Sequence, residues 1–165
     1  MTNEQLLNNL FKGVKGKRTA KIVSDLPKLQ SERDLQSQVC KWLKIQYPDM
    51  IFFSDFAAGI KLTIGQANIR SIQACRGKYL DLTILEPIGN FKGLIIEIKR
   101  DKSDLFLVDG ITLKSDHVRE QYDMILRLRA KGYAADFGVG FDDVAGMVQK
   151  YMKGFVEYKG INYRK

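Results

Sequence analysis

Two short apolar runs, residues 79–85 and 94–99, carry charged side chains where a buried strand is usually aliphatic. The second run, Leu-Ile-Ile-Glu-Ile-Lys, is mostly β-branched and follows Gly93, so it predicts a buried strand. Side chains alternate along a strand, which places Glu97 and Lys99 on the same face. A charge inside such a strand costs free energy unless it is paired or binds a metal ion.

The first run alternates in the same way, and residues 86–90 between the runs contain Pro, Gly and Asn, which predicts an antiparallel hairpin. In such a hairpin Asp81 can share a face with Glu97 and Lys99. Two converging carboxylates can bind a hard cation such as Mg²⁺, and a lysine beside them can orient or deprotonate an attacking water. The alternative is structural: Glu97 and Lys99 neutralise each other at the end of the sheet, and Asp81 lies in water.

The composition is that of one globular domain, with 165 residues of which 45% are hydrophobic and 28% charged. Lys and Arg number 27 against 19 Asp and Glu, a net charge of +8. This excess favours a polyanionic partner, nucleic acid above all, although an anionic membrane surface would also fit.

We expect a cytoplasmic protein, because no apolar run approaches the ~20 residues of a membrane span and no signal-peptide pattern is present. Cys40, Cys75 and His117 show no metal-ligand spacing, so free thiols in a reducing compartment are expected.

The first thirty residues are predicted to form an N-terminal helix and a basic arm. Residues 2–11 fit a short amphipathic helix. The segment that follows is basic and contains Lys15, Lys17, Arg18 and Lys21. It is either a solvated linker or an arm that follows nucleic-acid phosphates.

A stronger helix is predicted from Ser31, because Ser31 and Asp34 match a capping box and apolar residues recur at helical spacing. Glu32 falls on the buried side of its first turn. This acid either favours the helix N-terminus through the macrodipole or faces the carboxylate patch. Next to Asp81 and Glu97, we favour the second interpretation.

The segment before the first run is predicted to contain a strand, a turn, an extended piece and a short helix, at residues 50–53, 57–59, 61–64 and 66–75. Arg70, Arg76 and Lys78 place positive charge just ahead of Asp81. They belong either to a solvated basic loop or to a surface that contacts phosphates.

A second long helix is predicted from Asp116, as N-cap, to a stop at Gly132. Gln121 falls in its apolar sector, and since a buried amide needs partners, we expect it to face the site. His117 is interpreted as a surface or cap residue, with a role as base or ligand as the alternative.

The remaining segments are a polar loop at 101–114, a strand at 134–139 and a helix from Asp142 to Met152. The strand is rich in small residues, so we expect it to be central or closely packed. The basic, aromatic tail, residues 153–165, is open to three interpretations: a final strand pair, a dimer contact or a nucleic-acid contact.

This order of elements, with an acid in the first helix and Asp81 ahead of Glu97-Ile98-Lys99, resembles the PD-(D/E)XK nuclease superfamily. Within it the chain is most similar to the VRR-NUC branch and to phage and archaeal Holliday-junction resolvases. The resemblance covers residues 31–152, and Leu80 stands where the family has proline. The sequence marks are Glu32 with Leu35-Gln36, Gly77 to Leu82, Glu97-Ile98-Lys99, Gln121 and Gly132-Tyr133.

The resemblance implies a restriction-endonuclease-like α/β fold, a single-domain αβββαβ core whose central mixed sheet is flanked by helices. It also implies an Mg²⁺ or Mn²⁺ site with Lys99 as the catalytic lysine and Gln121 as a helper. The metal ligands it implies are Asp81, Glu97, the carbonyl of Ile98 and, as an auxiliary acid, Glu32.

The implied activity is that of an endonuclease that hydrolyses DNA phosphodiesters, in DNA repair or recombination of a bacterium or phage. No sequence-reading module is evident, which favours recognition of DNA shape, such as Holliday junctions or flaps, by a homodimer. Two alternatives remain: a non-catalytic nucleic-acid-binding protein on the same fold, and the cleaving subunit of a restriction system.

Overall fold

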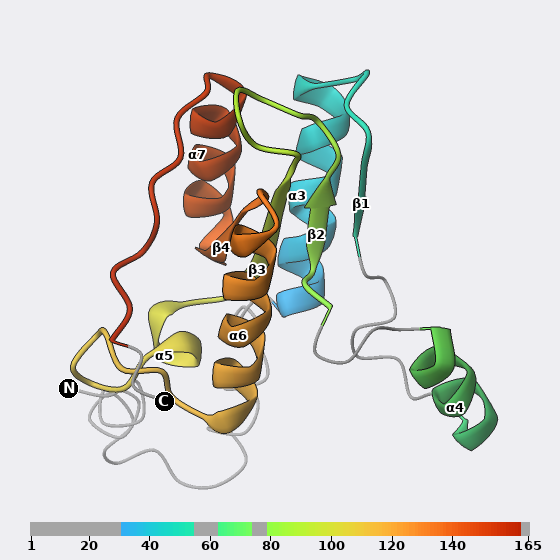
Figure 1. Ribbon diagram of the computed structural model, residues 1–165, viewed down its shortest axis with the longest axis vertical. Coiled ribbons are helices and arrows are strands. Elements are labelled where there is room, and N and C mark those ends of the chain that lie inside the picture. The colour runs from blue at the N-terminus through green and yellow to red at the C-terminus, as the bar shows by residue number, and fades with distance from the viewer. Residues whose placement is uncertain (1–30, 55–62, 74–78, 163–165) are drawn as a thin grey trace, which may run out of the picture.

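A four-stranded mixed sheet between helices forms the centre of the computed structural model, which describes residues 31–54, 63–73 and 79–162 (Figure 1). The elements in chain order are α3 (Glu32–Gln46), β1 (Phe52–Ser54), α4 (Ile64–Gln73), β2 (Leu82–Ile84), β3 (Leu94–Lys99), α5 (Lys102–Leu105), α6 (Asp116–Ala130), β4 (Ala134–Val139) and α7 (Gly140–Met152). The strand order is β1-β2-β3-β4, with β3 and β4 parallel and the other pairs antiparallel. The predicted α/β class, with a mixed sheet flanked by helices, is confirmed.

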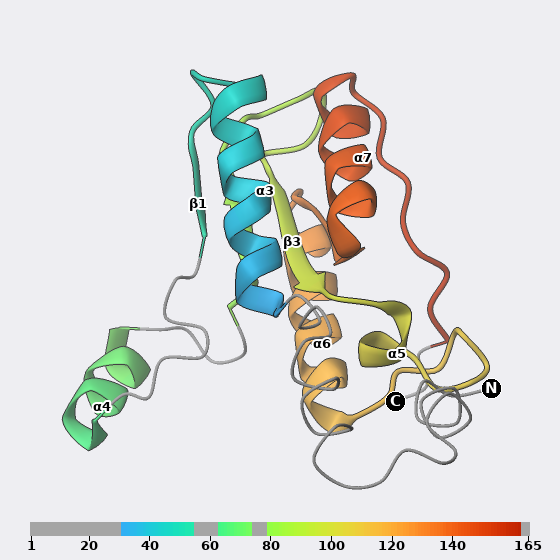
Figure 2. The same cartoon turned by 180° about the vertical axis from the view of Figure 1, so that it is seen from behind.

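Helices cover the two faces of the sheet unequally. α3 and α7 lie over one face and α6 over the other, whereas α4 lies apart from the sheet in both views (Figures 1 and 2). Two hydrophobic clusters fill the space between these layers. α3, α6 and α7 therefore each bury one apolar side, as the helical spacing of their apolar residues predicts.

β3 is the strand on which both clusters meet, and all six of its residues are buried. Leu94, Ile96 and Ile98 belong to the cluster beneath α3 and α7, while Ile95 belongs to the cluster beneath α6. The predicted alternation along this strand is confirmed. Consequently Glu97 and Lys99 lie on the α6 side of the sheet, inside the protein.

The predicted strand at 134–139 is confirmed as β4. It is expected to be central or closely packed, and it is not central, because β4 lies at the end of the strand order. Its close packing is nevertheless evident at Gly138. A Cβ atom there would lie 2.5 Å from Val144 Cγ2 and 2.9 Å from Ile96 Cγ2. The small residues of β4 thus admit α7 closely to the sheet.

The C-terminal segment covers the outer edge of β4 in place of another strand. The backbone amide of Lys159 donates to Asp136 Oδ2 at 2.6 Å, and Asp136 also pairs with Arg129 at 3.2 Å. The Arg129 guanidinium lies over the ring of Tyr158, 3.8 Å from its centroid. Burial raises the pKa of Asp136, against the lowering effect of these partners. In the described part of this tail, Asn162 forms only an isolated bridge, so of the three interpretations the final strand pair does not apply there.

Several helices begin at other residues than predicted, as their N-caps show. α6 has Ser115 as its N-cap, with Asp116 in the first turn, and α7 begins at Gly140 with Asp142 in its first turn. The predicted loop at 101–114 contains α5, which Asp101 caps. Ile64, expected to be extended, begins α4.

Two further predictions fall outside what the structure covers: the helix at 2–11 and the turn at 57–59 lie outside the described residues. No helix in residues 31–54, 63–73 and 79–162 combines the length and apolar character needed to cross a membrane.

The close approach of α7 to β4 predicts opposite effects for two Gly→Ala substitutions. Gly138→Ala should lower the free energy of unfolding by about 1–3 kcal/mol, because the methyl group overlaps Val144 and Ile96. Gly146→Ala, in α7, meets no atom within 4 Å and should raise it by about 0.5–1 kcal/mol. Urea unfolding measures both, and equal effects would contradict this packing.

Candidate active site

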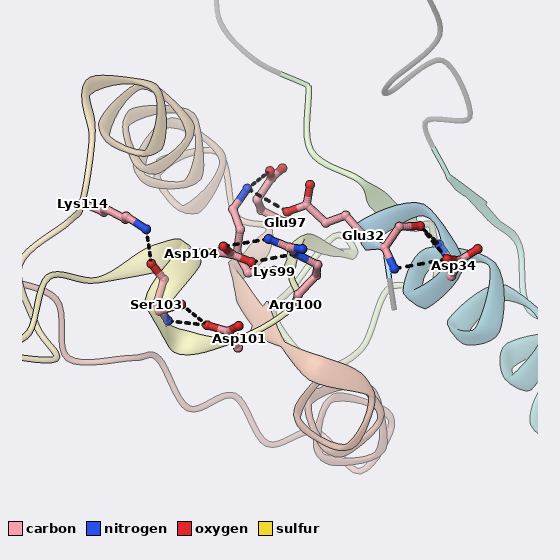
Figure 3. Close-up of polar contacts among 10 residues, drawn as sticks. Glu32, Asp34, Glu97, Lys99, Arg100, Asp101, Ser103, Asp104 and Lys114 are labelled. Carbon is pink, nitrogen blue, oxygen red and sulfur yellow. Dashed lines mark hydrogen bonds and ion pairs between the residues drawn. The ribbon is translucent and has the colours of Figure 1, made fainter. Parts of the chain in front are cut away.

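Three elements bring their ends together at the C-terminal end of β3. Glu97 and Lys99 come from β3, Gln121 comes from the second turn of α6, and Glu32 comes from the first turn of α3. The close-up in Figure 3 shows Lys99 between the carboxylates of Glu97 and Glu32.

Glu97 is the centre of this group and is only 3% exposed. Its Oε1 accepts a hydrogen bond from Lys99 Nζ at 2.9 Å and another from Gln121 Nε2. Lys99, itself 6% exposed, also lies 3.5 Å from Glu32 Oε1. The expectation that Gln121 faces these residues agrees with this geometry, since α6 turns the amide inward onto the strand.

Burial strongly perturbs the acid at the centre. It raises the pKa of Glu97 to about 8, the Asp81 carboxylate adds to the rise, and the Lys99 ammonium opposes it. Burial also acts to lower the pKa of Lys99, but the surrounding carboxylates, Glu97 foremost, hold that pKa above its ordinary value. A buried carboxyl whose pKa is raised this far, beside an amine whose pKa is held up by carboxylates, is typical of a functional site.

Two buried oxygen atoms in this group, Glu97 Oε2 and Gln121 Oε1, accept no hydrogen bond from the described residues. A buried acceptor left in this way costs about 1–3 kcal/mol. The other polar atoms of these two side chains are joined by the hydrogen bond from Gln121 Nε2 to Glu97 Oε1. An unsatisfied carboxylate oxygen of this kind suits a hard cation, which would supply the missing partner.

Asp81 approaches the same strand from the hairpin partner. It lies one residue before β2, and its Oδ2 accepts a hydrogen bond from the backbone amide of Ile98 at 2.8 Å. A strand residue points its N–H and C=O to the same side, so the carbonyl of Ile98 is directed toward the side on which Asp81 lies. The expected convergence of Asp81 with Glu97 therefore occurs at the place where the β2–β3 ladder ends.

Two residues that the sequence reasoning left without a role hold Asp81 in place. Gln36 Nε2 and Ser54 Oγ both donate to the Asp81 carbonyl, at 3.0 and 2.9 Å. Gln36 is 8% exposed on the inner side of α3, one turn beyond Glu32. The signal that could have found it is the one that singled out Gln121: an amide within an apolar helix sector must find partners.

Glu32 differs from its predicted environment, because its side chain is 51% exposed and does not lie on the buried side of α3. The reason is its place in the first turn, where α3 begins beside the end of the sheet. It nevertheless points toward Lys99 (Figure 3).

The structure describes some of the other residues that the sequence singled out and leaves the predicted phosphate contacts untested. His117 is exposed in the first turn of α6, in keeping with a surface role, and Cys40 is a free thiol. Arg70 lies in α4, and nothing is described of its side chain. The remaining predicted phosphate contacts lie outside the described residues: Lys15, Lys17, Arg18, Lys21, Arg76 and Lys78.

Asp81, Glu97 and the Ile98 carbonyl together offer oxygen ligands of the type that Mg²⁺ and Mn²⁺ prefer. Among the described residues, no three His, Cys, Asp or Glu side chains gather closely enough to form a metal cluster by themselves. A set of two carboxylates and a backbone carbonyl, completed by water, is the arrangement that fits Mg²⁺, which retains several waters. The residues present thus fit such an ion.

Comparisons with known proteins add one finding. No protein-family model and no curated protein matches the chain. A solved structure described as "VRR_NUC domain protein" is similar, with a TM-score of 0.55 and 24% sequence identity over 84% of this chain and 100% of that one. The fold is shared with that protein. At this level of identity the likeness concerns the fold alone.

The raised pKa of Glu97 predicts that the free energy of unfolding decreases as pH rises. The unfolded carboxyl has a pKa near 4.5, so between about pH 4.5 and 8 the native state binds the proton more tightly, and stability falls as pH increases. Glu97→Gln removes this titration. In chelator, the change in the free energy of unfolding caused by Glu97→Gln should be more favourable at pH 9 than at pH 5, by about 1–4 kcal/mol, because only the unsubstituted protein loses stability over this range.

The matched control is Glu157→Gln, an exposed acid whose pKa is lowered by Lys150. Its effect on stability should stay constant between pH 5 and 9. Urea unfolding at both pH values measures the difference. A Glu97→Gln effect that does not change with pH would contradict the burial of an ionisable acid at this position.

Proposed function

We propose that this protein is a metal-dependent nuclease that hydrolyses DNA phosphodiester bonds, with its reaction centre in residues 31–152. The observation that carries the proposal is the buried Glu97, paired with Lys99 and Gln121, next to an Asp81 carboxylate fixed by the Ile98 amide. The fold shared with a VRR_NUC domain protein supports it, as does the net charge of +8.

Asp81, Glu97 and the carbonyl of Ile98 would hold Mg²⁺ or Mn²⁺, and Glu32 would act as an auxiliary acid. When bound, such an ion supplies a Lewis acid for the phosphoryl oxygen and lowers the pKa of water. Glu97, with a pKa of about 8, would have to lose its proton to hold such an ion, so metal binding would be weaker at acid pH.

The protein's own residues then orient the reactants. Lys99, anchored by Glu97 and within 3.5 Å of Glu32, holds a positive charge at the end of β3, where it can orient the attacking water and stabilise charge on the phosphate. Gln121 fixes the rotamer of Glu97 through its amide. Gln36 and Ser54 fix the backbone of Asp81. The basic segments around Arg70 and in the N-terminal region would hold the flanking phosphates.

We further propose that branched DNA, such as a four-way junction or a flap, is the preferred substrate and that two copies act on it as a homodimer. The sequence lacks a module that reads base edges, which supports recognition of DNA shape. A DNA substrate also fits the expected location in the cytoplasm of a bacterial or phage-infected cell.

One observation favours a second candidate function, a nucleic-acid-binding protein without catalysis. Lys99 Nζ and Glu97 Oε1 lie only 2.9 Å apart, as they would in a purely structural pair. Such a pair would leave Asp81 without a functional role, so substitutions at the site distinguish the two functions.

The cleavage test uses labelled linear duplex, single strand, flap and four-way junction, each with Mg²⁺, Mn²⁺ or chelator. The proposal expects metal-dependent cleavage. Lys99→Ala should reduce the cleavage rate by about 10²–10⁴-fold, because it removes the charge beside the scissile phosphate. Asp81→Asn should abolish cleavage while DNA binding persists.

Lys131→Ala, beyond the C-terminal end of α6, serves as the control for loss of one positive charge and should cleave at the unsubstituted rate. DNA binding without cleavage by the unsubstituted protein would favour the non-catalytic function. Cleavage that survives Lys99→Ala would refute the assigned site.

The support of Asp81 by α3 predicts a change in metal affinity. Gln36→Leu removes the donor to the Asp81 carbonyl and should weaken Mn²⁺ binding about ten-fold, the usual scale for residues that orient a ligand. Gln38→Leu, an exposed glutamine of the same helix, should leave Mn²⁺ affinity unchanged. Calorimetric titration with Mn²⁺ measures both, and equal affinities would show that Gln36 does not position the ligand.

A further inference from the structure

A short hairpin follows the candidate site and presents an apolar tip to solvent. Residues 106–113 are closed by a bridge between Phe106 and Leu113. At the tip, Val108 is completely exposed, and Leu107 and Ile111 are 49% and 47% exposed. Aliphatic side chains at a loop tip are unusual, since turns normally carry polar residues.

Internal hydrogen bonds give this tip one conformation. The amide of Leu107 donates to the Thr112 carbonyl at 2.8 Å, and the amide of Gly110, in a left-handed conformation with φ of 73°, donates to the Leu107 carbonyl at 3.0 Å. Asp109 Oδ1 accepts from the amides of Ile111 and Thr112, at 3.0 and 2.8 Å. The apolar side chains are therefore held outward by a defined turn.

The base of the hairpin is fixed to the candidate site by polar contacts. Arg100, the residue after Lys99, binds both carboxylate oxygens of Asp104 in α5, at 2.9 and 3.1 Å. Beyond the hairpin, Lys114 Nζ donates to the Ser103 carbonyl at 2.7 Å. Figure 3 shows these contacts on the segment that leads directly from Lys99.

Apolar packing ties the hairpin to the same place. Phe106 and Leu113 are buried in the cluster beneath α6, together with Leu80 and Val118. Leu80 precedes Asp81, and Val118 lies one turn before Gln121. The tip is thus presented at a fixed position relative to the site residues.

We propose that this tip, Leu107, Val108 and Ile111, is a wedge that packs against an unstacked base of branched DNA, an inference that rests on the proposed nuclease function. Leucine and isoleucine are among the side chains with which proteins separate base steps. The tip's continuity with the β3 segment that carries Lys99 favours DNA over a membrane or another protein. The substrate class is then DNA with a weakened or interrupted stack, such as a flap or a junction.

The test measures base unstacking without cleavage. A flap carries 2-aminopurine at its branch point, a base whose fluorescence rises when it leaves the stack, and the protein carries Asp81→Asn so that the DNA stays intact. This parent should raise the fluorescence on binding. Adding Leu107→Ser and Val108→Ser should abolish the rise and weaken flap binding about ten-fold, while binding of linear duplex stays unchanged.

The control is Ile45→Ser in the same background, because Ile45 is 75% exposed at the opposite end of α3 from Glu32. It should behave as the parent. If the tip variant matches the parent while the parent binds flaps, the wedge is refuted and the nuclease proposal stands. If the unsubstituted protein neither binds nor cleaves DNA, both proposals fail. A tip variant that loses only self-association or vesicle binding also refutes the wedge.

Discussion

The buried pair of Glu97 and Lys99 is the interaction on which the rest of the structure depends. Both charges lie on the inner side of β3, so neither can be solvated as it would be at the surface. α6 supplies the amide of Gln121, and α3 brings the carboxylate of Glu32 to the exposed side of the amine. Helices on both faces of the sheet therefore each place a polar side chain against this buried pair, at the C-terminal end of β3.

In the β2–β3 hairpin, a side chain of the candidate site replaces a backbone hydrogen bond of the sheet. β2 and β3 pair through residues 82–84 and 94–96, and the ladder then stops. The amide of Ile98 bonds to the Asp81 side chain instead of a backbone carbonyl. This exchange leaves the backbone satisfied and brings a second carboxylate next to Glu97.

The sequence predicted those parts of the protein that follow from periodicity and local chemistry. The alternation of β3, the capping box at Ser31 and the inward-facing Gln121 all come from patterns within a few residues. It could not place β4 at the sheet edge, since small residues indicate close packing but do not show whether the neighbour is a strand or a helix. It also missed the partners of Asp81: Gln36 and Ser54 reach its carbonyl from 45 and 27 residues away. Such contacts depend on tertiary structure.

The sealed edge of β4 limits how two copies of this protein could associate. The outward amide of Phe137 is bonded to Asp136, and the carbonyl of Ala135 accepts from Arg129. The backbone groups that an incoming strand would need are already engaged, and a buried acid stands in its path. A continuous sheet across two copies is therefore excluded at β4. In the described part of the chain, the strand left at the other end of the order is β1.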